Sequence, residues 1–140
     1  MPDVLQAVTE FPHQAVLTPK VHRVLGLNPT PFTGPGTNTY LIGMDGAEPL
    51  LLDTGVGVAA WKPLLAGHLA QHHAPPLRRC LMTHGHPDHQ GGIPQLRELF
   101  PDIACYKHPW PARDPADAGY QRLDGGDVVR GEGYTLHAIA

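Results

Sequence analysis

Charged residues are scarce in this sequence. Only 16% of the 140 residues are charged, the ten lysines and arginines are scattered, and the net charge is −3 with histidine neutral. This lack of a basic run weakens the case for a nucleic-acid partner, although a bound metal would add local positive charge. The hydrophobic fraction of 41% and the length predict a single domain with its own core.

Cysteines and targeting signals are scarce as well. Cys80 and Cys105 lie in apolar, strand-like runs, and we predict reduced core thiols instead of a disulfide. The first fourteen residues do not combine a basic stretch with an apolar one, and no run is long enough to cross a membrane. We therefore expect a cytoplasmic protein with no membrane partner, and the sequence does not predict an oligomeric state.

Turn-forming residues are abundant, with 16 glycines and 16 prolines. This composition predicts many short elements joined by tight turns and argues against a helical bundle. Apolar periodicity predicts helices from about residues 59–62 to 73 and over 92–100. It predicts strands over 21–25, 37–43, 49–53, 77–83, 103–106, 128–130 and 134–140. We expect a surface loop or short helix over 108–123, and a helical turn or edge strand over 4–8.

Three histidines and an aspartate are concentrated in residues 84–89, between an apolar strand and the glycine pair at 91–92. His84 and His86 are two residues apart, so an extended backbone projects both to the same side. Neutral imidazole is a good zinc ligand. Asp88 and His89 are adjacent and point in different directions unless the chain turns sharply. The pattern predicts a metal site at the end of a buried strand.

Two ligand arrangements follow from this spacing. In the first, His84 and His86 begin one metal site while Asp88 and His89 begin a second, so that two ions share a hydroxide. In the second, His84, His86 and His89 hold a single ion, and Asp88 serves as a catalytic general base or proton shuttle. The spacing alone leaves both arrangements open.

Asp53 is the next candidate residue, because it ends a separate buried strand. We expect its carboxylate to lie behind the metal ligands and to orient a ligand histidine or the backbone of residues 83–89. The alternative is an ordinary turn or helix N-cap aspartate before the first helix.

Other histidines are given no metal role. Those near the end of the first helix are expected to be solvated, where a helix C-terminus favours them. Two more lie on predicted strands and are expected to be ordinary sheet residues. The first group is His68, His72 and His73, and the second is His22 and His137.

The sequence around the histidine motif resembles the metallo-β-lactamase superfamily. The resemblance rests on THGHPDH at residues 83–89, the glycine pair after it, and LDTG at residues 52–55. The segments at 24–29 and 36–43 are similar to β-lactamase-like endoribonucleases, a subgroup that includes polyketide thioesterases. The similarity extends from about Val21 to Ala140.

The resemblance implies an α/β fold, the αββα sandwich of this family, in incomplete form. Residues 1–140 would be the N-terminal part of a single domain truncated at its C-terminus, with the first sheet and its two helices. The downstream histidine, bridging aspartate and last histidine of the family are not found in the chain. We therefore expect the inner face of the first sheet to be exposed.

The resemblance also implies a function. It implies a zinc-dependent hydrolase with two Zn²⁺ ions per complete domain and a metal-bound hydroxide as nucleophile. His84 and His86 would hold the first zinc, Asp88 and His89 the second, and Asp53 would support them. The substrate would be an ester, thioester or phosphodiester; the acidic balance favours a small-molecule or acyl substrate, with RNA as a second option. The alternative is a fragment that binds metal weakly and does not catalyse.

Overall fold

The computed structural model describes residues 11–139, and within them seven strands form one sheet. Strands β1 to β4 pair antiparallel, and β4 to β7 pair parallel. The element predicted over residues 4–8 lies outside the described residues. In spatial order the strands are β1 (Gln14–Val16), β2 (Val21–Leu25), β3 (Asn38–Ile42), β4 (Leu50–Leu52), β5 (Arg79–Leu81), β6 (Ala104–Lys107) and β7 (Gln121–Arg122).

The change from antiparallel to parallel pairing brings the predicted site residues to one edge of the sheet. A tight turn joins β3 to β4, whereas helix α2 (Trp61–Gln71) carries the chain from β4 to β5. Such a crossover makes β4 and β5 parallel, so their carboxyl ends lie at the same edge. Asp53 follows β4, and Thr83 and the motif follow β5. The short helix α3 (Pro87–Gln90) and then α4 (Ile93–Leu99) lead on to β6.

The position of Pro63 agrees with the start of helix α2. Pro63 lies in the first turn, where a missing backbone N–H costs nothing, and the helix starts at Trp61 as predicted. The helix ends at Gln71 instead of residue 73, with His72 as its C-cap. Trp61, Leu65 and Leu69 are buried, as the apolar stripe predicts.

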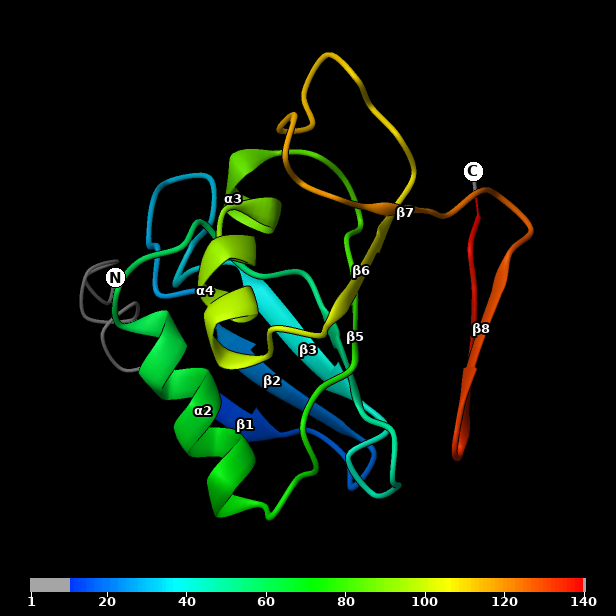
Figure 1. Cartoon of the computed structure of the whole chain (residues 1–140). Helices are drawn as coiled ribbons and strands as arrows, with labels where there is room; N and C mark the ends of the chain where they lie inside the picture. Colours follow the sequence, from blue (N-terminus) through cyan, green and yellow to red (C-terminus); the bar gives the residue numbers. More distant parts are fainter. Residues whose placement is uncertain (1–10, 140) are drawn as a thin grey trace.

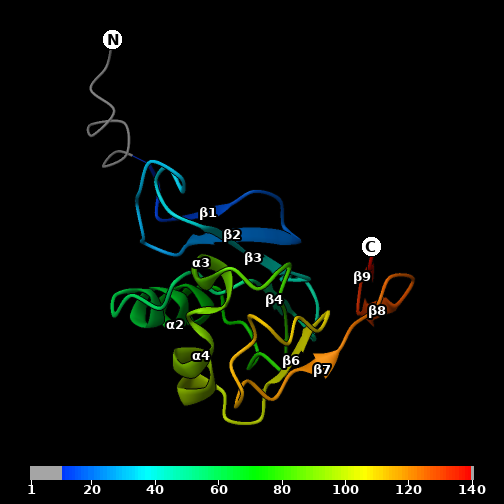
Figure 2. The same ribbon diagram turned by 90° about the horizontal axis from the view of Figure 1, so that it is seen from above.

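The helices cover one face of the sheet, as Figures 1 and 2 show for α2 and α4. Side chains alternate along the central strands, so Leu51 and Cys80 face the helices. There they join a buried core that includes Trp61, Leu65 and Leu96. This core fixes α2 and α4 against the strands that carry the site.

A separate hairpin partly covers the opposite face. Strands β8 (Val128–Gly131) and β9 (Tyr134–His137) pair only with each other and lie on the far side of the sheet from the helices (Figure 1). Tyr134 and Leu136 pack against Leu50 and Leu81, of which Leu50 is fully buried and Leu81 is 6% exposed. The expectation of an exposed inner face is wrong for these residues, because the hairpin lies over them. A cavity of about 400 Å³ remains between sheet and hairpin, beside Leu52.

Cys80 and Cys105 are neighbours across β5 and β6, and both are buried with free thiols, as predicted. No helix within residues 11–139 is both long enough and apolar enough to cross a lipid bilayer.

Candidate metal centre

A buried carboxylate joins the two strand ends. Asp53 is 4% exposed, and its backbone N–H donates to the Leu81 carbonyl. Oδ1 of Asp53 accepts a hydrogen bond from the Thr83 backbone N–H at 2.8 Å. Oδ2 accepts from Thr83 Oγ1 at 2.7 Å and from His89 Nδ1 at 2.8 Å. The helix-cap alternative for Asp53 is wrong, because α2 begins at Trp61 with Ala60 as its N-cap.

These hydrogen bonds determine which ring nitrogen of His84 and of His89 carries the proton and which keeps a lone pair. An ionised carboxylate only accepts, so His89 donates through Nδ1 and keeps a lone pair on Nε2. Thr83 donates its hydroxyl proton to Asp53, so its oxygen accepts from His84 Nδ1 at 2.8 Å. His84 therefore also keeps its lone pair on Nε2. One carboxylate thus sets the tautomer of two histidines, directly for His89 and through Thr83 for His84.

The predicted ligands lie together at the end of β5. The ring centroid of His84 is 4.6 Å from that of His86 and 4.1 Å from that of His89. Burial, and then the neighbouring rings of His89 and His86, lower the pKa of His84, which favours its neutral form. The backbone turns sharply at α3, with Pro87 in its first turn, so that Asp88 and His89 share one helical turn.

The donor types at the motif, imidazole nitrogen and carboxylate oxygen, suit a divalent cation. Oδ2 of Asp88 lies 3.5 Å from His89 Nε2, too far for a good hydrogen bond. Two ligand atoms of one tetrahedral zinc are separated by about 3.4 Å, given metal–ligand bonds of roughly 2.1 Å. Together with the free nitrogen lone pairs, this spacing suits a cation shared by Asp88 and His89.

Glycines allow the two loops of the site to touch. The His89 carbonyl accepts hydrogen bonds from the backbone N–H and the hydroxyl of Thr54, at 2.8 and 2.9 Å. A Cβ atom at Gly91 would lie 2.3 Å from the Val56 carbonyl oxygen, and one at Gly92 would lie 2.5 Å from the Thr54 carbonyl oxygen. Any larger residue would force the loops after β4 and around α3 apart.

A hydrogen-bonded support lies behind the motif and was not predicted from the sequence. Gln90 Nε2 donates to the Gly85 carbonyl at 2.7 Å, and the Tyr120 hydroxyl donates to Gln90 Oε1 at 2.7 Å. Burial raises the pKa of Tyr120 to about 12. Next to them, Lys107 is 2% exposed and pairs with Asp114 at 2.6 Å. Most of these residues come from segments predicted only as a strand end or an irregular loop, so no spacing indicated their roles.

An open pocket lies beside the motif. Its volume is about 360 Å³, and Asp53, Asp88 and His89 lie along it. Phe32, which is almost fully exposed, and Tyr40 add aromatic surface. The pocket can therefore receive a substrate with an apolar part next to the candidate metal ligands.

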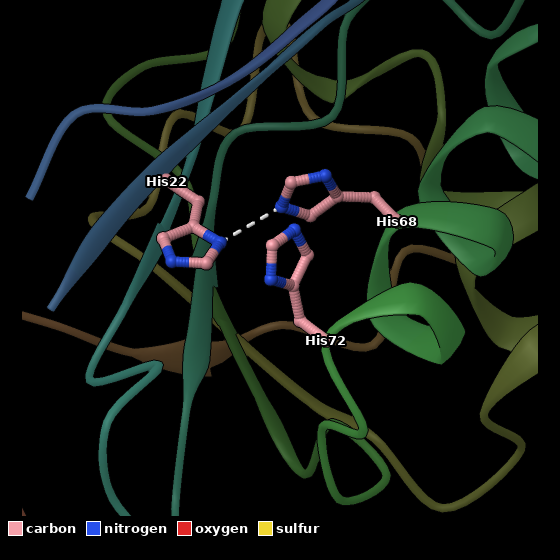
Figure 3. Close-up of side chains that lie close together, drawn as sticks. All are labelled: His22, His68 and His72. Carbon is pink, nitrogen blue, oxygen red and sulfur yellow. Dashed lines mark hydrogen bonds between the residues drawn. The ribbon is translucent and has the colours of Figure 1, made fainter. Parts of the chain in front are cut away.

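A second group of histidines contradicts the prediction for His68. His68, predicted to be solvated, is 2% exposed. It contacts His22, which lies in strand β2 as predicted and is 4% exposed. His72 is half-buried in the same group, and only His73 is exposed as expected. Figure 3 shows the three rings between β2 and α2. The helical period could have predicted this burial, because His68 and His72 continue the buried face of the helix that begins at Trp61.

Comparison with known proteins identifies the class of the chain. The family model described as the metallo-beta-lactamase superfamily matches residues 32–136, and the chain belongs to this superfamily. A curated relative from Aspergillus fumigatus, named atrochrysone carboxyl ACP thioesterase, is 41% identical over 96% of this chain and 41% of its own length. The lactamase-like protein ptaB of Pestalotiopsis fici is 42% identical over 88% of this chain and 37% of its own length. The chain thus spans about two fifths of these relatives.

Solved structures agree on the fold. A metallo-β-lactamase family protein from Thermus thermophilus superimposes with a TM-score of 0.67 at 20% identity, over 88% of this chain and 52% of its own. The subclass B3 metallo-β-lactamase BJP-1 of Bradyrhizobium japonicum superimposes with a TM-score of 0.64 at 17% identity, over 99% of this chain and 55% of its own. The mixed α/β arrangement is therefore that of part of the metallo-β-lactamase fold.

Proposed function

We propose that the polypeptide carrying this chain is a zinc-dependent hydrolase that cleaves an acyl thioester, with the acyl group held on a carrier protein. The observation that carries the proposal is the Asp53 carboxylate, which bonds both Thr83 and His89 and leaves imidazole lone pairs free at one sheet edge. The choice of thioester is supported by relatives named as ACP thioesterases. Because the chain spans two fifths of those relatives, we propose that residues 1–140 are the N-terminal part of one such domain.

In this proposal His84 and His86 hold a first zinc ion, and Asp88 and His89 hold a second. When bound, zinc lowers the pKa of a coordinated water to about 7 and so supplies a nucleophile in neutral solution. A single-ion arrangement on His84, His86 and His89 stays the alternative, and Asp88 is then the general base.

The protein's own groups have distinct tasks. Asp53 holds the rings of His84 and His89 in the tautomer that leaves Nε2 free, so the ligands are oriented before the cation arrives. Asp88 is one third exposed at its side chain and lies in the first turn of α3, where it can reach both a ligand position and the open pocket. The aromatic surface of Phe32 and Tyr40 would receive the apolar acyl part of the substrate.

Phosphodiester cleavage, with RNA as substrate, is the second possibility within the same chemistry. The net charge of −3 and the scattered basic residues give it less support than thioester hydrolysis. For the 140-residue chain by itself, the alternative is weak metal binding without turnover, because four motif ligands shared by two ions leave each ion short of protein ligands.

The test uses the complete polypeptide that carries this chain, an acyl thioester of an acyl carrier protein, and a short RNA. We expect thioester hydrolysis that is lost after chelation and restored by zinc. Cleavage of RNA alone would favour the phosphodiester alternative, and no turnover of either substrate by zinc-loaded protein would contradict the proposal. The 140-residue chain assayed in parallel should bind zinc more weakly at residues 84–89 and turn over little.

A further inference from the structure

A second cluster of three histidines lies at the junction between the sheet and helix α2. His22 projects from β2, His68 projects from α2, and His72, four residues later, projects from the C-cap of α2 (Figure 3). One ring nitrogen from each residue can be chosen so that all three lie within 4.8 Å of one another. The ring centroids are separated by 4.4 to 5.1 Å.

The hydrogen bonds of His68 aim a lone pair into this cluster. Its Nδ1 donates to the side-chain oxygen of Gln14 at 2.6 Å, so Nε2 of a neutral ring carries the lone pair. That Nε2 lies 2.8 Å from Nδ1 of His22 and accepts a hydrogen bond from it. Metal-binding histidines usually donate their second N–H to a carboxylate, a backbone carbonyl or water. The amide oxygen of Gln14 is an acceptor of the same chemical kind as a backbone carbonyl. Gln14 thus occupies the position of an outer partner that orients a ligand.

The environment favours the neutral forms of His22 and His68. Burial, with the neighbouring rings of His72 and His22 as smaller causes, lowers the pKa of His68 to about 4. Burial and His72 also lower the pKa of His22. Three imidazoles without a carboxylate or thiolate among them form a donor set suited to divalent zinc, copper or nickel.

The cluster is separate from the motif site. Helix α2 starts beside the motif, since a Cβ at Gly92 would lie 2.9 Å from the Trp61 ring. With a rise of about 1.5 Å per residue, His68 lies roughly 10 Å further along the helix axis and His72 roughly 16 Å. His22 is likewise near the end of β2 remote from Gly26, which approaches Gly55 of the motif edge.

We propose that His22, His68 and His72 form a second metal site that binds one divalent transition ion of the zinc class and clamps α2 to β2. Binding through Nδ1 of His22 requires the proton of that ring to move from Nδ1 to Nε2. Nδ1 of His22 and Nε2 of His68 must then part by about half an ångström, from 2.8 Å to the roughly 3.3 Å between two nitrogens on a tetrahedral zinc. Half-buried His72 lies at the solvent side, where water completes the coordination. The site's role is structural, because an ion that joins a strand to a helix binds only the folded state.

The experiment measures zinc binding in the full chain after the motif site has been disabled by His84→Ala and His86→Ala. We expect this background to retain one tight zinc per chain, counted by plasma mass spectrometry and titrated against a competing chelator. Adding His72→Ala should weaken binding by more than the roughly 10- to 100-fold that loss of an outer partner costs. Adding His73→Ala, an exposed neighbour outside the cluster, should change nothing. No zinc in the background protein, or equal binding with His72→Ala and His73→Ala, would overturn the proposal.

A second arm keeps the test decisive if the background protein fails to fold. In protein with an intact motif, the zinc content should be one ion lower with His72→Ala than with His73→Ala, and equal contents would contradict the site. Gln14→Ala, a change at an exposed residue, should weaken the retained zinc by about 10- to 100-fold. Every readout is metal binding, so a failure of the proposed hydrolase activity would leave this test unaffected.

Discussion

The two histidine clusters of this protein are built in different ways. The motif cluster lies on the loop after β5 and on the short helix α3, is partly exposed, and is oriented by the buried carboxylate of Asp53. The cluster of His22, His68 and His72 lies on strand β2, on helix α2 and at the C-cap of that helix. It is mostly buried, and the neutral amide of Gln14 orients His68. A cation between carboxylate-supported ligands beside an open pocket can meet a substrate, whereas a cation between core elements mainly holds them together.

The largest effect should follow removal of an exposed ligand from the motif cluster. His86→Ala is expected to abolish thioester hydrolysis, with a loss of about 10³-fold or more in kcat/KM, because zinc contributes several kcal/mol to such reactions. His73→Ala, also exposed but in neither cluster, is the matched control and should keep full activity. Comparable turnover of the two variants in the same assay would contradict a catalytic role for the motif cluster.

Asp53→Asn tests whether the carboxylate distinguishes the motif cluster. An amide presents N–H groups where Thr83 and His89 already donate, so the free energy of unfolding should fall by about 1–3 kcal/mol. Zinc affinity at the motif should fall by about 10- to 100-fold. Chelator competition and urea unfolding measure the two quantities. Unchanged zinc affinity would mean that Asp53 does not orient the ligands.

The contact between the loops of the motif edge can be tested by adding one methyl group. Gly91→Ala places Cβ against the Val56 carbonyl and should destabilise the fold by about 1–3 kcal/mol. Gly67→Ala is the control, because nothing lies within 4 Å of a Cβ there, and alanine should stabilise helix α2 by up to about 1 kcal/mol. Thermal unfolding of both variants measures the difference, and equal shifts would argue against the tight contact.

The smallest expected effect concerns the support behind Gly85. Tyr120→Phe removes the hydrogen bond to Gln90 and should cost about 0.5–1.5 kcal/mol of unfolding free energy at neutral pH. Because the pKa of Tyr120 is raised to about 12, the unfolded chain, with a tyrosine pKa near 10, ionises first. The free energy of unfolding of the wild-type protein should therefore fall as pH rises from about 10 toward 12. In the Tyr120→Phe variant, which lacks the titrating hydroxyl, this free energy should fall less over the same pH range. A pH series of urea unfolding curves tests both points.

Local patterns predicted much of the fold and the motif edge. Strand periodicity, the proline positions and the H-x-H-x-D-H spacing all act over a few residues, so β2 to β6, α2, α4 and the motif could be placed from the sequence. Asp53 could be singled out because a carboxylate directly follows a buried strand. Its exact partners, Thr83 and His89, depend on the parallel pairing of β4 with β5.

Contacts between distant segments could not be predicted in the same way. His22 meets His68 across 46 positions, and Tyr120 meets Gln90 across 30, so no spacing motif links them. The helical period placed His68 on the buried face of α2, but the preference of histidine for helix ends and solvent argued the other way. The hairpin over Leu50 and Leu81 was predicted as a hairpin, whereas its packing against the sheet was not.

The decisive measurement is the zinc content of the complete polypeptide, determined together with its thioester hydrolysis before and after metal removal. We predict that purified wild-type protein holds zinc, that His84→Ala/His86→Ala loses motif zinc and all turnover, and that chelated wild-type protein regains activity with added zinc. Hydrolysis that continues undiminished in protein stripped of metal, or purified protein that contains and binds no zinc, would contradict the claim that residues 84–89 form a zinc-dependent hydrolytic centre.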